Sequence, residues 1–226
     1  AVLGAEVCEI YTDVEGVYTA DPRLVPNARK IEEISYDTML EMAAAGAGVM
    51  HSRAIEFGKK FNVPIHVRSS QTETRGTIIM TETGSMEAIA VQGVTLKEDL
   101  AFISLNAVPN TPGIAARIFA EVARNHLLVD DIVQNIYDGG KFANLGFSTN
   151  AGDAAEARTV CEQLAASLGI GSVEVDEGVS KVSAVGVGMR THTGIASTMF
   201  EAIAKAEINI ENISTSEIVI SCIVRR

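Results

Sequence analysis

The sequence lacks the features that mark membrane proteins, disulfide-stabilised proteins and nucleic-acid-binding proteins. No apolar run reaches the about 20 residues of a membrane helix, and no basic, apolar leader opens the chain. The three cysteines, Cys8, Cys161 and Cys222, are too far apart for a metal motif or a disulfide framework. Only 18 basic residues stand against 29 acidic ones, and the net charge of −11 argues against a nucleic-acid partner. We therefore expect a cytoplasmic protein.

The chain does contain enough apolar sequence to form real cores. Its 226 residues are 47% hydrophobic, which suffices for one large domain or for two to three small ones. It does not begin with Met, and it stops directly after a strand-like apolar run. We expect a fragment of a longer polypeptide.

The first 85 residues predict an α/β layer. Short apolar runs predict strands at Val7–Thr12, Pro64–Arg68 and Thr77–Met80. Two helices are expected between the first two strands, and the small polar residues Thr81–Ser85 are expected to form a linker.

Local signals place the two helices. Ser35 or Asp37 can cap a helix that begins near Thr38, and Gly46 and Gly48 are expected to break it. The second helix is expected to bury one apolar face, whose residues are spaced by 4, 3 and 4 positions: Met50, Ala54, Phe57 and Phe61.

The rest of the chain contains an internal repeat with an offset of 81 residues, from position 114 to position 195. Gly113 and Gly194 each precede a helix. The apolar faces of these helices match one for one: Ile114, Ala115, Ile118, Phe119 and Val122 in the first copy, and Ile195, Ala196, Met199, Phe200 and Ile203 in the second.

The element order of the first copy is β-α-β-β-α-β, which predicts a ferredoxin-like unit. Its expected strands are Ala101–Val108, Leu127–Val133, Phe142–Thr149 and Val173–Asp176, and its second helix carries an apolar face of Val160, Cys161, Leu164 and Leu168. The second copy begins at Val182–Gly188, has a strand at Ile208–Ile213 and runs out before its second helix. We infer that a strand at Ala88–Thr95 completes its sheet.

A polar loop follows the first expected strand. Loops at the ends of buried strands are where α/β sheets bind ligands. Thr12 and Asp13 can bond a ribose or an adenine edge, Tyr18 offers a flat face, and Arg23 presents a fork for phosphate oxygens. An Asx-rich turn, in which Asp13 and Asp21 bond backbone amides, explains the same composition equally well.

The turns that end at Gly113 and Gly194 are the other candidate binding sites. A helix N-terminus offers free amides and a positive dipole end to a carboxylate. Asp130 can take an α-ammonium group, and Gln134 can bond to either end of an amino acid. The alternative is that the polar residues of these turns only cap the helices: Asn110, Thr111 and His192.

Neither a metal site nor a catalytic triad can be assembled from the sequence. The four histidines, His51, His66, His126 and His192, are scattered. No Ser/His/Asp or Cys/His arrangement is evident. We therefore expect no metal ligands and no catalytic residues within this chain.

The loop Tyr11–Arg23 resembles the nucleotide loop of the amino-acid kinase superfamily. Val25–Ala28, Val63–Ser70 and Ile213–Ile218 resemble the aspartate kinases within it. The resemblance implies an α/β fold that is a partial, carbamate-kinase-like amino-acid kinase domain. It also implies that the residues that contact ATP are Thr12, Asp13, Tyr18, Asp21 and Arg23.

Some motifs of that family are missing from the sequence. The Gly-rich and Lys-bearing phosphate loops and the aspartate-binding residues of the family's N-terminal half are absent, so the chain alone is expected to be inactive. Many members carry a Lys in the stretch that is Gly46–Met50 here, and Gly48 takes its place. We expect Gly48 to serve close backbone packing.

The repeat resembles tandem ACT domains, whose amino-acid sites lie between paired domains. The expected division is 1–85 for the kinase part, 97–177 for the first ACT domain, and 86–96 with 178–226 for a truncated second one. The resemblance places the effector site on twelve residues: Asn110, Thr111, Gly113, Ile114, Ala115, Val129, Asp130, Gln134, Thr191, His192, Asn209 and Ile210.

The implied parent is an aspartate kinase, which uses ATP with Mg²⁺ to phosphorylate the side-chain carboxylate of L-aspartate. This reaction leads to lysine, threonine and methionine. Lysine, threonine or both are expected to inhibit it through the ACT domains, which are also expected to form a homo-oligomer. No membrane partner is expected.

Three alternatives stand beside this interpretation. A non-catalytic regulatory subunit could start at Met86, although residues 1–85 argue against it. Glutamate 5-kinase shares the nucleotide loop, but the tandem repeat argues against it. An RNA-binding ferredoxin-like domain needs an aromatic strand pair and a basic surface, which this sequence lacks.

Overall fold

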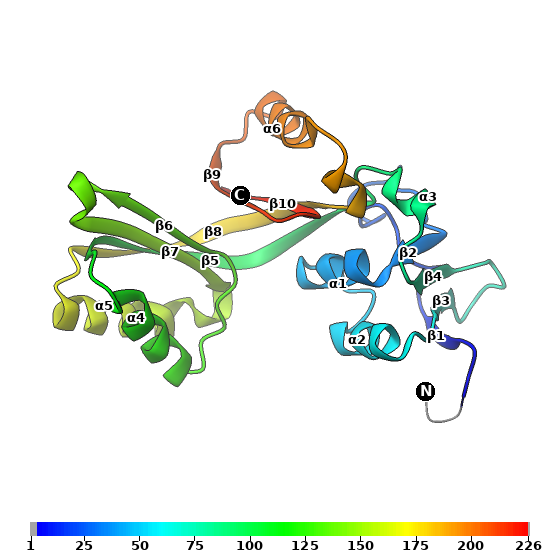
Figure 1. Ribbon diagram of the computed structural model, residues 1–226, viewed down its shortest axis with the longest axis horizontal. Helices are drawn as coiled ribbons and strands as arrows, with labels where there is room; N and C mark the ends of the chain where they lie inside the picture. Colours follow the sequence, from blue (N-terminus) through cyan, green and yellow to red (C-terminus); the bar gives the residue numbers. More distant parts are fainter. Residues whose placement is uncertain (1–3, 226) are drawn as a thin grey trace. The chain divides into compact units, whose positions relative to one another are not determined.

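The computed structural model describes residues 4–225 and confirms the expected α/β class. It divides into two compact units (Figure 1). Unit 1 combines the chain up to Lys97 with Lys181–Val224, and unit 2 is Glu98–Ser180 with the residues after Val224. The expected domain boundaries at 1 and 226 lie outside the described residues.

Unit 1 begins with a four-stranded sheet in the order β1-β3-β4-β2. The strands are β1 (Cys8–Thr12), β2 (Glu33–Ser35), β3 (Ile65–Ser69) and β4 (Thr77–Met80). β1 runs parallel to β3, and β2 runs parallel to β4. The helices α1 (Tyr36–Ala44) and α2 (Ser52–Phe61) supply the rest of its core. The short strand β2 was not predicted from the sequence.

The start and the end of α1 follow the sequence signals. The Ser35 hydroxyl accepts a hydrogen bond from the Thr38 amide at 3.1 Å, so Ser35 is the expected cap. The helix ends at Ala44, Ala45 is its C-cap, and Gly46 follows with a φ of 111°. A Cβ on Gly46 would lie 2.9 Å from the Leu96 carbonyl oxygen, so only glycine fits this turn.

The predicted buried face of α2 is wrong. Phe57 and Phe61 are 61% and 49% exposed and stack on each other, with ring centroids 6.3 Å apart. The buried residues of the helix are Ile55 and Gly58, and the Ile65 side chain occupies the space beside Gly58. Met50 is buried but precedes the helix. Spacings of 3 and 4 fit two faces of this helix, and the packing of Gly58 against β3 selects the other one.

The remainder of unit 1 is the second copy of the repeat with the chain that leads into it. Its elements are α3 (Gly84–Glu87), the start of β5 (Gly93–Pro109), the end of β8 (Ser172–Val185), η3 (Val187–Arg190), α6 (Ile195–Lys205), β9 (Ile210–Thr215) and β10 (Val219–Arg225). The strand order β5-β8-β10-β9 confirms that the segment after Ala88 completes this sheet, although its strand begins only at Gly93. No residue of α6 is fully buried.

Unit 2 is a ferredoxin-like β-α-β-β-α-β fold, as expected from the first copy. It consists of β5, α4 (Ile114–Arg124), β6 (Ile132–Tyr137), η1 (Asp138–Gly140), β7 (Phe142–Asn150), η2 (Ala151–Asp153), α5 (Ala154–Leu168) and β8. The strand order is β6-β7-β5-β8, and α4 and α5 cover one face of the sheet (Figure 1).

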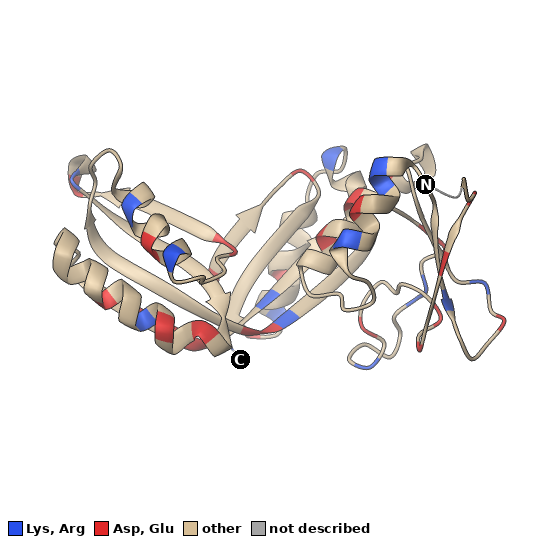
Figure 2. Cartoon of the chain, turned by 90° about the horizontal axis from the view of Figure 1, so that it is seen from below, with Lys and Arg blue, Asp and Glu red and all other residues tan. Residues whose placement is uncertain are grey.

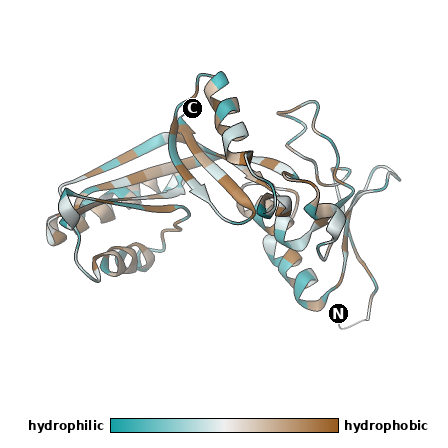
Figure 3. Cartoon of the chain, turned by 45° about the horizontal axis from the view of Figure 1, so that its top comes forward, coloured by the Kyte–Doolittle hydropathy of each residue, from teal (hydrophilic) through white to brown (hydrophobic). Residues whose placement is uncertain are grey.

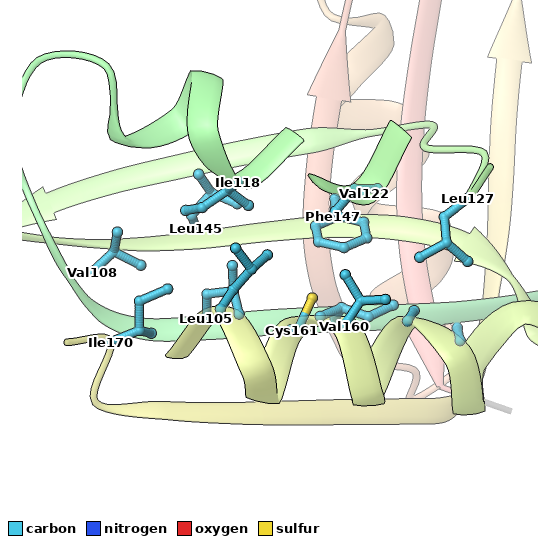
Figure 4. Packing of buried hydrophobic residues seen from close by; sticks show 14 of the residues in the cluster. Leu105, Val108, Ile118, Val122, Leu127, Leu145, Phe147, Val160, Cys161 and Ile170 are labelled. Atoms are coloured by element: carbon cyan, nitrogen blue, oxygen red, sulfur yellow. The ribbon is translucent and has the colours of Figure 1, made fainter. Parts of the chain in front are cut away.

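The core of unit 2 lies between this sheet face and the two helices. Ile118 and Val122 of α4 and Cys161 of α5 meet Leu145 and Phe147 of β7 (Figure 4). The helices of both units alternate hydrophobic and hydrophilic residues around their circumference (Figure 3). Burial raises the pKa of the Cys161 thiol to about 11, because the core disfavours the thiolate. Cys161 is therefore a packing residue.

The repeat predicted from the sequence is confirmed at the helix starts. Gly113 and Gly194 are the N-caps of α4 and α6, and their φ angles are 88° and 85°. Both glycines adopt the left-handed conformation that other residues disfavour. The strands that follow start later than predicted, at Ile132 in the first copy and Ile210 in the second.

Two pairs of predicted strands are single long strands in the structure. β5 joins the end of the strand predicted at Ala88–Thr95 to the one predicted at Ala101–Val108. β8 joins the strand predicted at Val173–Asp176 to the first part of the one predicted at Val182–Gly188, and it ends at Val185. The polar residues between each pair contain no proline and no left-handed glycine that would end a strand. Each strand thereby extends from one unit into the other. The expected linker Thr81–Ser85 instead runs into α3.

The burial of α2 predicts different costs for two substitutions on that helix. Ile55→Ala removes a fully buried side chain and is expected to destabilise the protein by about 2–5 kcal/mol. Phe57→Ala removes an exposed ring and is expected to change stability by no more than about 0.5 kcal/mol. Chemical denaturation of both variants measures the difference. Equal losses of stability would show that the helix buries the face with Phe57.

Candidate nucleotide loop and effector turns

The expected nucleotide loop lies at the carboxyl end of the parallel pair β1 and β3. Thr12 is paired with Ser69 at the end of both strands, and the Ser70 amide donates to the Thr12 carbonyl at 2.8 Å. This is the edge of a parallel sheet at which α/β proteins bind their ligands. The Thr12 hydroxyl donates to the Asp13 carboxylate at 2.9 Å, so the first two predicted residues already form one polar group.

A buried hydroxyl from a distant strand holds the loop in place. Thr77 of β4 is fully buried, and its Oγ1 accepts from the Val17 amide at 2.8 Å and donates to the Ile31 carbonyl at 2.5 Å. Gly16 has a φ of 146°, and a Cβ there would lie 2.5 Å from this Oγ1. The close approach therefore requires glycine at position 16. Sequence reasoning missed Thr77, because it lies 60 residues from its partner.

Asp21 and Arg23 form an ion pair at the far end of the loop. The Arg23 Nη2 lies 2.7 Å from the Asp21 carboxylate, and the Arg23 amide donates to the same group at 2.9 Å. These hydrogen bonds lower the pKa of Asp21 and raise that of Arg23. Asp13 also contributes to the raised pKa of Arg23, so the two lie within electrostatic reach. The Asx-turn alternative is therefore confirmed for Asp21.

Glu15 fixes the middle of the loop through hydrogen bonds. It is not among the site residues predicted from the sequence. The Thr72 and Thr74 hydroxyls donate to its carboxylate at 3.5 and 3.3 Å. Burial and the neighbouring Glu15 raise the pKa of the Tyr18 phenol. Glu15 thus connects Tyr18 with the loop between β3 and β4. The combined surface offers carboxylate, hydroxyl, phenol and guanidinium groups, which suit a nucleotide.

In the first copy, the effector residues surround the start of α4. No side chain caps this helix, and the side-chain amide of Asn110 donates to the Gly140 carbonyl at 2.8 Å. The capping alternative for Asn110 is therefore wrong. Ile114, Ala115 and Val129 are half-buried against the core of unit 2. Asp130 precedes β6, where its amide donates to the Ser148 carbonyl, and Gln134 lies on β6 with its side chain exposed.

In the second copy, the polar side chains of the turn lie within reach of a carbonyl group of the turn itself. The Thr191 hydroxyl donates to the Gly188 carbonyl at 3.2 Å, and His192 Nδ1 lies 2.7 Å from the same oxygen. Neither residue caps α6. Asn209 and Ile210 lie at the start of β9, with Asn209 exposed and Ile210 half-buried. These four residues belong to unit 1, and the other eight predicted effector residues belong to unit 2.

Neither a metal centre nor a membrane helix appears in the part of the chain that the structure covers. Among residues 4–225, no three His, Cys, Asp or Glu side chains are grouped to hold a metal ion. No helix in the same range is long and apolar enough to cross a membrane. Acidic and basic residues are interspersed along both units (Figure 2).

Comparison with known proteins decides the family. The amino acid kinase family model matches residues 1–69, and an ACT domain model matches residues 182–226. The aspartate kinase of Pseudomonas putida is 44% identical over 224 residues, which are 99% of this chain and 54% of that protein. The crystal structure of aspartokinase alpha and beta subunits includes a chain that is 37% identical, with a TM-score of 0.56. The match covers 60% of this chain and 88% of that one. The chain belongs to the aspartate kinase family.

Crystal structures of a more distant family member cover nearly the whole chain. E. coli aspartokinase III in complex with aspartate and ADP is 26% identical, with a TM-score of 0.83 over 99% of this chain and 49% of that one. The same enzyme in complex with lysine and aspartate gives a TM-score of 0.79 at 25% identity. The chain thus spans about half the length of the P. putida and E. coli enzymes.

The expected role of Gly48 in close backbone packing is wrong. A Cβ at this position would meet no atom within 4 Å, so no neighbouring backbone requires a glycine there. The sequence could not show this, because the space around position 48 depends on the connection between α1 and α2.

The ion pair in the nucleotide loop predicts a specific response to substitution. Because Arg23 lowers the pKa of Asp21, Arg23→Met is expected to raise that pKa toward the ordinary value of about 3.9. An NMR pH titration of the Asp21 carboxyl carbon measures the shift. Arg29→Met, on the same loop, is the matched control and is expected to leave it unchanged. An unaltered Asp21 titration in Arg23→Met would exclude the ion pair in solution.

Proposed function

We propose that this chain is the nucleotide-loop and regulatory part of an aspartate kinase. The parent enzyme transfers the γ-phosphoryl group of ATP to the side-chain carboxylate of L-aspartate. The observation that carries the proposal is the Thr12–Arg23 loop at the carboxyl end of β1 and β3, in one chain with two ACT-like folds. The complex of E. coli aspartokinase III with aspartate and ADP supports the choice of substrates.

The loop residues take complementary parts in binding ATP. Thr12 and Asp13, already hydrogen-bonded to each other, bind the ribose or the adenine edge. Tyr18 packs against a flat group, and Arg23, with Asp21 beside it, binds phosphate oxygens. Mg²⁺ enters with ATP and neutralises the phosphates, as phosphoryl transfer requires. The remaining phosphate contacts and the aspartate site come from the rest of the polypeptide.

We further propose that the chain divides as its resemblance implies. Residues 1–85 are the kinase part, 97–177 are the first ACT domain, and 86–96 with 178–226 are the second. An end-product amino acid, lysine or threonine, binds the ACT domains and shifts the kinase to a less active state. The complex of E. coli aspartokinase III with lysine supports an amino-acid effector of this kind.

The effector site has two parts in this proposal. The start of α4, from Asn110 to Ala115, offers uncapped helix amides to the carboxylate of the effector. Asp130 and Gln134 bind its polar end, and Val129 lines the site. The second copy contributes Thr191, His192, Asn209 and Ile210.

A homo-oligomer is part of the same proposal. Strand β6 is at the edge of its sheet and exposes Ile132, Ile136 and Tyr137 by 52%, 54% and 41%. An exposed apolar edge strand pairs readily with another chain. We propose that β6 meets its equivalent in a second copy of the chain.

A non-catalytic regulatory subunit of aspartate kinase is the second candidate. It is favoured by the likeness to the regulatory subunit of aspartate kinase from Thermus thermophilus, which is 36% identical and of which this chain covers 89%. The nucleotide loop argues against it, because a regulatory subunit needs none. The length of the natural polypeptide distinguishes the two candidates, since the first requires about twice as many residues.

Asp13→Ala in the full-length enzyme tests the nucleotide assignment. Loss of a charged hydrogen-bond acceptor costs about 1.5–3 kcal/mol, so the KM for ATP is expected to rise about tenfold or more. Glu56→Ala, an exposed acid on α2, is the control. Steady-state kinetics with aspartate and ATP measure the KM for ATP of both variants. The 226-residue chain alone is expected to show no turnover. An unchanged KM for ATP would leave Asp13 as a turn residue.

Asp130→Ala tests the effector site. An ammonium–carboxylate contact of the same strength predicts an inhibitory concentration of lysine or threonine that is about tenfold higher, with uninhibited kcat nearly unchanged. Glu156→Ala, an exposed acid on α5, is the control. Inhibition and thermal stability are measured on the same variants. A folded Asp130→Ala enzyme with normal inhibition by both amino acids contradicts the assignment.

A further inference from the structure

The second repeat copy shares its hydrophobic core with the kinase part of unit 1. Val185, at the end of β8, is fully buried. It belongs to the same cluster as Val17 of the nucleotide loop, Met42 of α1 and Ile79 of β4. Protein cores are close-packed, so a shift of β8 is felt by the side chains around it. The second copy is therefore not an appendage on a flexible linker.

A series of backbone hydrogen bonds leads from this strand to the nucleotide loop. The Gln92 amide donates to the Val185 carbonyl at 2.9 Å, and the Val94 amide donates to the Thr19 carbonyl at 2.8 Å. Thr19 lies between Tyr18 and Asp21, two of the proposed nucleotide contacts. It is also fixed to Arg29 by a backbone bond of 2.8 Å and by its own hydroxyl, which accepts at 3.0 Å.

The turn of the second copy rests directly on the same segment. A Cβ on Gly188 would lie 2.2 Å from the Ile89 carbonyl oxygen, and one on Gly186 would lie 2.6 Å from the Ala90 carbonyl oxygen. Both contacts are between backbone atoms. A movement of the turn therefore cannot be accommodated by the rotation of a side chain and must displace the backbone at Ile89 and Ala90. We call residues 86–94, which run between the turn and the nucleotide loop, the connector.

Side chains reinforce the contact between the connector and the second copy. Met86 forms a small buried cluster with Val187 of η3 and Ile218, which precedes β10. Arg190 of η3 lies 3.4 Å from Glu82, before α3, and 3.6 Å from Glu217. These ion pairs are partly exposed and contribute little stability, so the glycine contacts and the buried cluster dominate.

We propose that the connector couples the turn of the second ACT copy to the nucleotide loop. A displacement of η3 passes through Ile89 and Ala90 to Val94, and from Val94 to Thr19, which positions Tyr18 and Asp21. This deepens the proposed function and rests on it, since it names the route by which an effector at the ACT domains changes ATP binding. The internal hydrogen bonds of Thr191 and His192 fit the role of the second turn as a rigid part of this route.

The test is Gly188→Ala in the full-length enzyme, with Gly84→Ala as the matched control. Gly84 lies in α3, and a Cβ there meets nothing within 4 Å. We expect Gly188→Ala to speed hydrogen exchange at the Val94 amide and to raise the KM for ATP, each about threefold or more. Gly84→Ala is expected to leave both unchanged. A folded Gly188→Ala enzyme with normal Val94 exchange and normal KM for ATP overturns the proposal.

The wild-type enzyme supplies a second test that needs no variant. The inhibitory amino acid, lysine or threonine, is expected to alter hydrogen exchange at the Val94 amide. Inhibition with unchanged exchange at Val94 overturns the coupling even if Gly188→Ala fails to fold. Absence of aspartate-dependent ATP turnover in the wild type would instead refute the proposed function. The effect of Gly188→Ala on hydrogen exchange at Val94 tests the coupling between η3 and the nucleotide loop whether or not the protein is an active kinase.

Discussion

A close contact between the backbone at the start of η3 and the backbone at Ile89 and Ala90 fixes the second repeat copy against the rest of unit 1. Gly186 and Gly188 permit it, because a methyl group at either position would collide with a carbonyl oxygen. The contact holds the end of β8 where Val185 can enter the core beneath α1. Residues separated by about 100 positions in sequence thereby fold as one body with the nucleotide loop.

The nucleotide loop has little regular structure of its own and depends on that body for its shape. The Thr77 hydroxyl fixes Val17, Glu15 joins Tyr18 to the loop after β3, and Val94 fixes Thr19. Each support comes from a different part of unit 1. The hydrogen bond from Val17 to Thr77 is buried and is costly to break without replacement, so it constrains the loop more firmly than the exposed contacts of Glu15 do. A change in any of these contacts would change the shape of the loop that we propose binds ATP.

Sequence reasoning succeeded where the signal is local. The Ser35 cap and the paired glycines before α4 and α6 are short-range patterns, and the structure confirms them. It failed where the answer depends on distant partners. Phe57 has the right spacing for a core face, yet the fit of Gly58 against Ile65 turns that face outward. The supports of the nucleotide loop from Thr77 and Val94 were not predictable for the same reason, because their partners lie far away in the sequence.

The kinase part and the second ACT copy are expected to unfold as a single cooperative unit, because they share one hydrophobic core. Native-state hydrogen exchange in the full-length protein tests it most directly, by comparing the amides of Val67 and Ile79 with those of Val185 and Cys222. If they form one unit, the same opening event exposes all four amides, and their opening free energies are equal. Val185→Ala is then expected to lower all four opening free energies by the same amount. Two separate opening free energies, of which only the one for Val185 and Cys222 responds to that substitution, would contradict the account.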